Sequence, residues 1–256
     1  MLEGLYAGAI QDAAERESKL SSAEVERLAL QAVAPIDALV AFAKAENVKV
    51  LAEIKRASPS KGSMDSIANP AELATTYADF GATGISVLTE GHKFLGSLDD
   101  LRAVRKVVSV PLLRKDFIAN EYQILEARAA GADIVLLIVA GIPARLLERL
   151  KHFAEQMGMT VFIETHSADE VRYAVDIDSR FLGVNARDLS TFETDRNLFA
   201  SLNHLIPEST IKVAESAVRN AEDVRHYRAA GADVVLVGEA LVTGNPAELL
   251  REFTAI

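Results

Sequence analysis

Three segments of the chain repeat one pattern, and their spacing constrains the fold more than any other feature. Each begins with Gly-Ala and continues as an apolar run, at residues 81–88, 131–138 and 231–238. Glycine often follows the end of a helix, and a short apolar run is typical of a buried strand. The intervals between the repeats are multiples of about 25 residues, the length of one strand plus one helix in a parallel α/β protein.

Further apolar segments fill these intervals. With the three repeats they make eight candidate strands, the other five being 48–54, 110–115, 160–164, 181–185 and 211–215. Segments with helix start signals alternate with them, at 70–80, 97–108, 143–157, 220–230 and 245–253. Near-continuous Val, Ile and Leu runs are typical of parallel strands that are covered on both faces. We therefore predict an α/β fold of the (β/α)₈ TIM barrel type.

An open, doubly wound Rossmann-type sheet is the alternative architecture. It is disfavoured because no Gly-x-Gly-x-x-Gly motif follows the first strand. A chain of 256 residues fits one barrel, so we expect a single domain over 1–256. Residues 1–47 precede the first strand, and we expect them to form an N-terminal helical extension of two or three helices.

The composition limits the classes of function. The net charge of −10 disfavours binding to nucleic acid or to an anionic membrane surface. No apolar run is long enough to span a membrane, and the N-terminal segment has mixed charges unlike a secretion signal. The absence of cysteine fits a cytoplasmic location. The five histidines show no metal-ligand spacing and there is no Walker loop, so we expect neither a metal nor a nucleotide site. We expect all five to be surface or structural residues, and His166 is the one near the strand ends.

The first strand ends in a charged pair, Glu53 and Lys55. Strand side chains alternate between faces, so these two residues point the same way. A charged pair at the end of a buried strand is costly unless it is paired or used. The polar loop 58–62 that follows suits an anion. The alternative is a solvated salt bridge at a strand end.

Other strands end in charged or polar residues too, and barrel active sites form at this end of the strands. The two lysines and three glutamates expected to converge there are Lys55, Lys115, Glu53, Glu164 and Glu215, with Asn185 and Arg187 beside them. Partial burial and close unlike charges shift pKa values toward acid–base use. Arg114 is expected to face the helices and to pair with Asp116, a structural role.

The last two units indicate a phosphate site. Ser216 and Ala217 follow the seventh strand, and Gly238 and Glu239 follow the eighth. Backbone N–H groups of these two loops commonly hold phosphate in this fold, and Gly238 permits close approach of the backbone. We therefore expect a small phosphorylated substrate.

Several motifs, taken together and in order, resemble the indole-3-glycerol-phosphate synthase family over essentially the whole chain. They are residues 52–62 (AEIKRASPSKG), 88–90 (LTE) with 94–97, the 113–117 segment, 163–164, 183–189 (GVNARDL), 214–216 and 237–240 (VGEA). The resemblance implies a carboxy-lyase of tryptophan biosynthesis without a cofactor. It would convert 1-(2-carboxyphenylamino)-1-deoxyribulose 5-phosphate into indole-3-glycerol phosphate, CO₂ and water.

The resemblance also implies roles for individual residues. Lys115 would be the acid for ring closure, and Lys55, Glu164 and Glu53 would serve the dehydration in an order left open. Arg187, with Ser58 and Asn185, would meet the carboxylate that leaves as CO₂, and Glu215 would hold hydroxyls or the amine. The remaining expected contacts are an apolar wall of Phe94, Phe117 and Leu136, and a phosphate site of Ser216, Ala217, Gly238 and Glu239.

The chain departs from the family pattern at one position, and two alternative functions remain. The family usually has glycine where this chain has Ala217, which resists positive φ, so phosphate binding is expected to differ. A related phosphate-binding barrel isomerase of tryptophan or histidine biosynthesis is one alternative, and a non-catalytic barrel scaffold is the other.

We expect the protein to be a monomer, with association with other tryptophan-pathway enzymes left open. We also expect the loop over 58–69 to close on the substrate.

Overall fold

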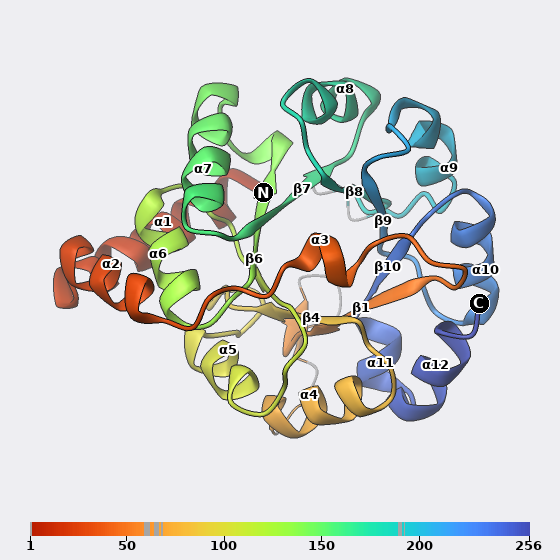
Figure 1. Ribbon diagram of the computed structural model, residues 1–256, viewed down its shortest axis with the longest axis horizontal. Coiled ribbons are helices and arrows are strands. Elements are labelled where there is room, and N and C mark those ends of the chain that lie inside the picture. Colours follow the sequence, from red (N-terminus) through yellow and green to blue (C-terminus); the bar gives the residue numbers. More distant parts are fainter. Residues whose placement is uncertain (1, 59–61, 64–66, 68, 189–190, 192) are drawn as a thin grey trace.

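Eight parallel strands close into a barrel within the residues that the computed structural model describes, which are 2–256 apart from 59–61, 64–66, 68, 189–190 and 192 (Figure 1). In order around the barrel they are β1 (Lys49–Ile54), β4 (Gly84–Leu88), β5 (Leu112–Lys115), β6 (Ile134–Ile138), β7 (Thr160–Thr165), β8 (Phe181–Asn185), β9 (Ile211–Glu215) and β10 (Val234–Val237), which pairs again with β1. The predicted TIM barrel is confirmed. A short antiparallel pair, β2 (Ala57–Ser58) and β3 (Gly62–Ser63), follows β1 outside the barrel.

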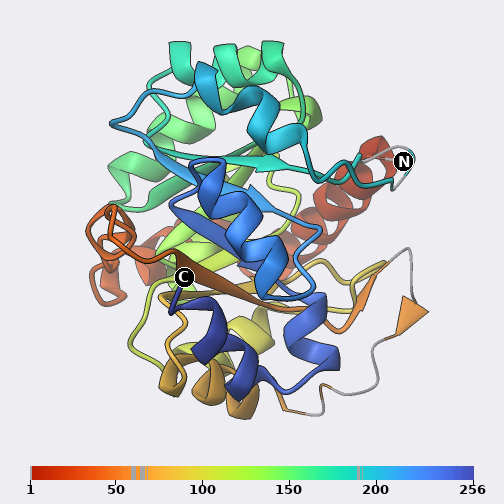
Figure 2. The same cartoon turned by 90° about the vertical axis from the view of Figure 1, so that its right-hand side faces the viewer.

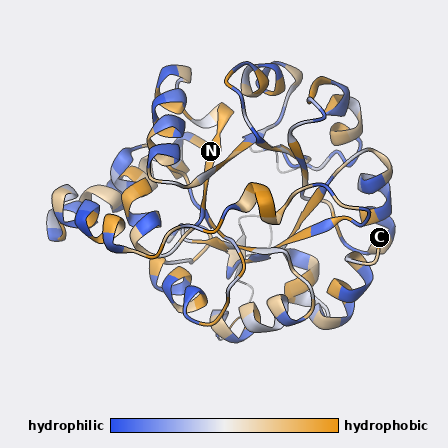
Figure 3. Ribbon diagram, viewed as in Figure 1, coloured by the Kyte–Doolittle hydropathy of each residue, from blue (hydrophilic) through white to orange (hydrophobic). Residues whose placement is uncertain are grey.

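Helices alternate with the strands and surround the barrel (Figure 1). They are α4 (Pro70–Asp79), α5 (Leu98–Arg105), α6 (Glu121–Ala129), α7 (Ala144–Gln156), α8 (Ala168–Asp176), α9 (Leu198–Leu202), α10 (Ala221–Ala229), α11 (Glu239–Thr243) and α12 (Pro246–Phe253), with single 3₁₀ turns at Val139–Gly141 and Asn203–Leu205. Figure 3 shows hydrophilic residues on their outer sides and hydrophobic residues along the strands.

Local chemistry sets the ends of these elements. The glycines of the three Gly-Ala repeats follow α4, α6 and α10 and have φ angles of 103°, 91° and 95°, as a helix C-terminus in the left-handed conformation requires. Asn69 begins α4, and its side chain accepts hydrogen bonds from the backbone of Ala71 and Glu72. Strand β5 starts at Leu112, two residues later than predicted, because Pro111 has no N–H to give to a strand ladder.

The N-terminal extension contains three helices, α1 (Leu2–Lys19), α2 (Ser22–Gln31) and α3 (Ala38–Ala41). Helix α2 packs on α6, where Val25 and Ala29 form a small buried cluster with Leu125. Helix α1 is tied to α6 by an ion pair between Arg16 and Glu126, with Nη2 and Oε2 2.9 Å apart. The extension therefore packs against the side of the barrel.

The barrel is closed at the amino ends of its strands. Phe42, which follows α3, is completely buried there, and its ring stacks on Phe181 at a centroid distance of 5.3 Å. The ring of Phe162 also packs against Phe181, at a centroid distance of 4.9 Å. In Figure 2, β1 runs away from this plugged end toward β2 and β3 on the right. These aromatic rings fill the barrel interior toward the amino ends of the strands.

Candidate active site

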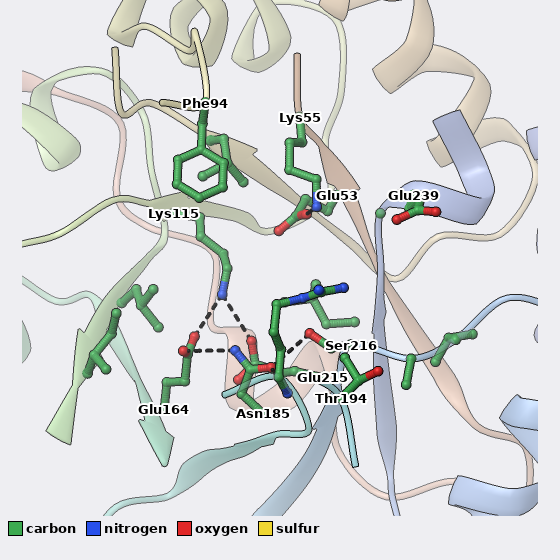
Figure 4. Close-up of a pocket in the computed structure, with 18 of the residues that line it drawn as sticks. Glu53, Lys55, Phe94, Lys115, Glu164, Asn185, Thr194, Glu215, Ser216 and Glu239 are labelled. Carbon is green, nitrogen blue, oxygen red and sulfur yellow. Dashed lines mark hydrogen bonds and ion pairs between the residues drawn. The ribbon is translucent and has the colours of Figure 1, made fainter. Parts of the chain in front are cut away.

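A cavity of about 540 Å³ lies at the carboxyl ends of the strands (Figure 4). All of the residues that the sequence singled out for the site line this cavity, except Ser58. They are Glu53, Lys55, Phe94, Lys115, Phe117, Leu136, Glu164, Asn185, Arg187, Glu215, Ser216, Ala217, Gly238 and Glu239. The side chain of Ser58 and most of the 58–69 loop lie outside the described residues.

Lys115 is bound between two glutamate side chains. Its Nζ lies 2.8 Å from Oε2 of Glu164 and 3.0 Å from Oε2 of Glu215 (Figure 4). These residues lie at the carboxyl ends of β5, β7 and β9, alternate strands of the barrel, whose inward side chains meet in one layer. Both glutamates are almost fully buried, and the Lys115 side chain is 15% exposed. The single ammonium group of Lys115 thus contacts the side chains of two buried acidic residues.

Burial and electrostatic interactions set the protonation states of the trio formed by Lys115, Glu164 and Glu215. Burial opposes the charge on Lys115, but attraction to Glu164 and then Glu215 raises the pKa of the ammonium group. Burial also opposes the charge on Glu164, but Lys115 above all holds its pKa below the usual range. Burial and then repulsion from Glu164 raise the pKa of Glu215 to about 8. At neutral pH the trio is therefore an ammonium, a carboxylate and a neutral carboxylic acid.

Asn185 connects this trio to the loops around it. Its Nδ2 donates to Oε1 of Glu164 at 3.0 Å, and its Oδ1 accepts from Ser216 Oγ at 2.8 Å and from the backbone N–H of Arg187 at 3.0 Å. These bonds fix the orientation of the Asn185 amide. The chain at Arg187 pairs with Thr194 in an antiparallel bridge, which holds this loop against the cavity.

Glu53 and Lys55 form the second charged pair of the cavity. Nζ of Lys55 lies 2.8 Å from Oε1 of Glu53, and the two side chains are 19% and 5% exposed. The pair is thus largely buried, which disfavours the solvated salt bridge that the sequence left as an alternative. A Cβ atom at Gly238 would lie 2.6 Å from Oε1 of Glu53, so only glycine leaves room for this carboxylate.

The apolar wall includes a residue from outside the barrel. Phe94 and Phe117 lie with ring centroids 6.2 Å apart, and Leu136 lines the cavity beside them. Leu5 of α1 also lines the cavity, and its neighbour Tyr6 packs edge-to-face on Phe117 at 5.5 Å. The extension thereby completes the wall.

The loop after β9 has an uncommon backbone. Ser216 and Ala217 have φ angles of 68° and 57°, both in the left-handed region. The sequence predicted that Ala217 would resist this conformation, yet it adopts it. Two arginines lie near this loop: Arg196 and Arg219 line the cavity and both contact the buried carboxylate of Asp223, at 2.7 and 3.5 Å. This side of the cavity is therefore cationic.

The sequence and fold were compared with those of known proteins. The family model described as indole-3-glycerol phosphate synthase matches residues 2–253. The protein of that name from Leifsonia xyli subsp. xyli (strain CTCB07) is 54% identical, over 100% of this chain and 98% of the relative. The one from Arthrobacter sp. (strain FB24) is 51% identical, over 100% and 96%. This chain belongs to the indole-3-glycerol phosphate synthase family.

Solved structures of lower identity support the fold alone. Thiamine phosphate pyrophosphorylase from Pyrococcus furiosus superposes with a TM-score of 0.62 at 15% identity, covering 80% of this chain and 93% of that one. 3-Hexulose-6-phosphate synthase from Salmonella typhimurium gives 0.59 at 16%, covering 81% and 97%. The barrel is shared well beyond the indole-3-glycerol phosphate synthase family.

Other residues of this family member have structural roles. Arg114 faces α6, is 1% exposed, and donates to Asp116 at 2.8 Å, so the predicted ion pair is confirmed. The carboxylate of Glu90 accepts the backbone N–H groups of His92, Lys93 and Phe94 at 2.7–2.9 Å. Glu90 holds the loop that carries Phe94, and it is not among the residues that line the cavity.

Sequence reasoning missed four features of the site: Leu5, the Arg196–Arg219 pair, Gly183 and His166. A Cβ at Gly183 would lie 2.3 Å from Oε1 of Glu215, so this glycine makes space for the acid. His166 was assigned to the surface or the scaffold, yet its Nε2 lies 3.3 Å from Oε1 of Glu164. The sequence placed His166 near the strand ends, two residues after Glu164, but did not predict this contact.

The part of the chain that the structure describes shows neither a metal-binding cluster nor a membrane-spanning helix. No group of three or more acidic or histidine side chains there is arranged to hold a metal ion. None of its helices is long and apolar enough to cross a membrane.

Proposed function

We propose that this protein converts 1-(2-carboxyphenylamino)-1-deoxyribulose 5-phosphate into indole-3-glycerol phosphate, CO₂ and water. The observation that carries the proposal is the position of Lys115, a charged acid held between Glu164 and Glu215 inside the cavity. Membership of the indole-3-glycerol phosphate synthase family supports the same reaction. That membership also disfavours the barrel isomerases considered as alternatives.

Ring closure needs an acid at the ribulose carbonyl. The aromatic carbon that carries the carboxylate attacks the carbonyl carbon, and Nζ of Lys115 gives a proton to the oxygen, which becomes a hydroxyl group. Loss of CO₂ then returns its bonding electrons to the ring and restores aromaticity. A positioned general acid typically contributes on the order of 10²–10⁴-fold to such a step.

Dehydration needs an acid at the new hydroxyl group and a base at the adjacent methylene. Glu53, Lys55 and Glu164 all line the cavity and supply one ammonium group and two carboxyl groups for these roles. The hydroxyl group leaves as water, and the base takes a proton from the methylene, which completes the indole double bond. Their order remains open.

The rest of the cavity matches the three parts of this substrate. Arg187 and Asn185 would meet the departing carboxylate, and Phe94, Phe117 and Leu136 would pack on the aromatic ring. Backbone N–H groups near Ser216, Ala217 and Gly238 would bind the phosphate, with Glu239 at the edge of this site. Glu215, neutral at pH 7, would hydrogen-bond to substrate hydroxyls or to the amine.

Mass spectrometry of the product tests the reaction. Purified protein incubated with the substrate should yield a compound lighter by one CO₂ and one H₂O, with the phosphate retained. An isomer of unchanged mass would instead support the alternative of a barrel isomerase, and unchanged substrate would support a non-catalytic scaffold.

We also propose that residues 1–256 form one domain and that the protein is a cytoplasmic monomer, with association with other enzymes of the pathway left open. The continuous hydrophobic core, from Leu5 in α1 to Phe253 in α12, supports a single domain. Light scattering of the purified protein should give the mass of one chain, and a larger mass would replace the monomer with an assembly.

A further inference from the structure

His166 lies between two carboxylates at the edge of the active site. Its Nε2 is 3.3 Å from Oε1 of Glu164, and its Nδ1 is 3.4 Å from Oε2 of Glu170. The backbone N–H of His166 donates to the same Oε2 at 2.9 Å, and Ser167 Oγ donates to the other oxygen of Glu170 at 3.2 Å. The imidazole is therefore held by the end of β7 on one side and by the first turn of α8 on the other.

The surroundings favour the charged form of this imidazole. The His166 side chain is only 13% exposed, and burial alone would lower its pKa. Its close contacts with Glu164 and Glu170, together with the attraction of their charges, outweigh burial and raise the pKa of His166 to about 10. The nearby charged or titratable groups beyond these two are Lys115 and Glu215, from β5 and β9, and Tyr6 from α1, all of which interact electrostatically with Glu164. His166 is thus an imidazolium at neutral pH.

Glu164 consequently lies between two cations. Lys115 binds Oε2, while Oε1 receives Nδ2 of Asn185 and faces His166. The contact with His166 is an ion pair rather than an aligned hydrogen bond, since Nε2 has no hydrogen-bond partner among the described residues. His166 does not line the cavity. His166 is therefore linked to the substrate site by its contact with Glu164 rather than by touching the substrate.

We propose that His166 is a positioning residue whose imidazolium keeps Glu164 ionised and aimed into the cavity while Lys115 gives its proton to the substrate. This inference rests on the proposed function. When Lys115 loses its proton, Glu164 loses one of its two cations while its side chain stays almost fully buried. A buried carboxylate without a cation binds a proton more tightly, so Glu164 would compete with the substrate for the proton of Lys115. The second cation removes that competition.

Three variants separate charge from structure. His166→Gln keeps a polar side chain without the charge, and His166→Lys restores a cation. His152→Gln changes an exposed histidine of α7 that contacts Gln156, and it serves as the control. For each variant, kcat and KM are measured against pH with 1-(2-carboxyphenylamino)-1-deoxyribulose 5-phosphate, and circular dichroism verifies folding.

His166→Gln is expected to lower kcat about tenfold with a much smaller change in KM. The acid limb of its kcat profile should move to higher pH by about one unit, because an unpaired Glu164 protonates more easily. His166→Lys should recover most of kcat and return the acid limb, and His152→Gln should match the wild type. An unchanged profile in His166→Gln, or equal losses in the Gln and Lys variants without a shift, would overturn the inference.

A titration followed by NMR tests the charge without turnover. The imidazole of His166 in the wild-type protein should stay protonated past pH 8, and titration near 6.5 would overturn the inference. Failure of the proposed function is distinguishable, since wild-type protein would then produce no indole product at all. Normal wild-type turnover together with a neutral His166 would refute only the role of His166.

Discussion

The Nζ of Lys115 lies 2.8 Å from Oε2 of Glu164, although 49 residues separate them in the chain. Both side chains reach this contact because their strands, β5 and β7, end at the same mouth of the barrel. The pair places a charged acid beside a carboxylate that cannot easily take its proton, since attraction to Lys115 and His166 keeps the pKa of Glu164 low. In the proposed ring closure, the carbonyl oxygen that gains negative charge is then the acceptor of the proton.

Removal of Lys115 should abolish chemistry and largely spare binding. Lys115→Ala is expected to lower kcat by about 10²–10⁴-fold, because the proton donor for ring closure is lost. The Kd for the substrate, measured by isothermal titration calorimetry, should change far less. Lys151→Ala is the control, since Lys151 lies on α7 and pairs only locally with Glu155. Near-normal kcat in Lys115→Ala would exclude Lys115 from the mechanism.

Arg187 should distinguish the substrate from the product. Arg187→Lys removes the two parallel N–H donors that a carboxylate accepts, a geometry that lysine cannot reproduce. Charge-assisted hydrogen bonds contribute about 1.5–3 kcal/mol, so the Kd for the substrate should rise at least about tenfold. The Kd for indole-3-glycerol phosphate should barely change, because the product has lost the carboxylate.

Both dissociation constants are measured by calorimetry, in the Lys115→Ala background to prevent turnover. Arg149→Lys, on the outer face of α7 and paired with Glu121, serves as the control. Equal weakening for the two ligands would place Arg187 at another part of the substrate, such as the phosphate.

The left-handed backbone of Ala217 carries a cost that glycine would remove. Its φ of 57° costs an alanine about 1–2 kcal/mol, whereas glycine loses about 0.4–1 kcal/mol through the greater entropy of the unfolded chain. Ala217→Gly should therefore raise the free energy of unfolding by roughly 0.5 kcal/mol, measured by urea denaturation. Ala14→Gly, an exposed position within α1, should instead lower it by about 1 kcal/mol. Destabilisation by Ala217→Gly would mean that the alanine methyl group makes a compensating contact.

Glu215 should give the protein a pH-dependent stability of defined sign. Its folded-state pKa of about 8 lies above the ordinary value of 4.5, so its stabilising contribution is complete below pH 4.5 and is lost as pH rises to 8. Glu215→Gln does not titrate. The free energy of unfolding of the variant should therefore improve relative to wild type between pH 4.5 and 8, and then level off.

Glu208→Gln is the control for the pH dependence of Glu215, because the pKa of Glu208 is shifted in the opposite direction. The pKa of exposed Glu208 is lowered to about 2, chiefly by its hydrogen bond with Lys212. The difference between this variant and wild type should stay flat between pH 4.5 and 8 and change only at lower pH. Urea denaturation across this pH range gives both comparisons, and a flat difference for Glu215→Gln would show that Glu215 is ionised throughout.

The regular spacing of apolar segments along the chain was enough to predict the fold. The charged and polar residues at the strand ends were enough to predict most of the site. Parallel strands must point their carboxyl ends the same way, so Lys115, Glu164 and Glu215 could be assigned to one mouth before their contacts were known. Glu53 and Lys55 pair as alternation along one strand predicts, with Nζ and Oε1 2.8 Å apart.

Contacts that depend on packing between distant elements could not be predicted. Leu5 reaches the cavity only because α1 folds back along the barrel, and no local pattern marks that path. The need for glycine at Gly183 appears only when Glu215 is placed against it from the neighbouring strand. His166 resembled a surface residue because its partner Glu170 is recognisable only once α8 begins beside the end of β7.

Turnover of 1-(2-carboxyphenylamino)-1-deoxyribulose 5-phosphate by the purified wild-type protein is the most direct measurement. The fluorescence of indole-3-glycerol phosphate should rise with time, one CO₂ should be released for each indole formed, and no added metal or cofactor should be required. The Lys115→Ala protein, once circular dichroism has verified that it is folded, should show almost no rise in this fluorescence. A folded wild-type protein that forms no indole product at saturating substrate would contradict the assignment of this cavity as a synthase active site.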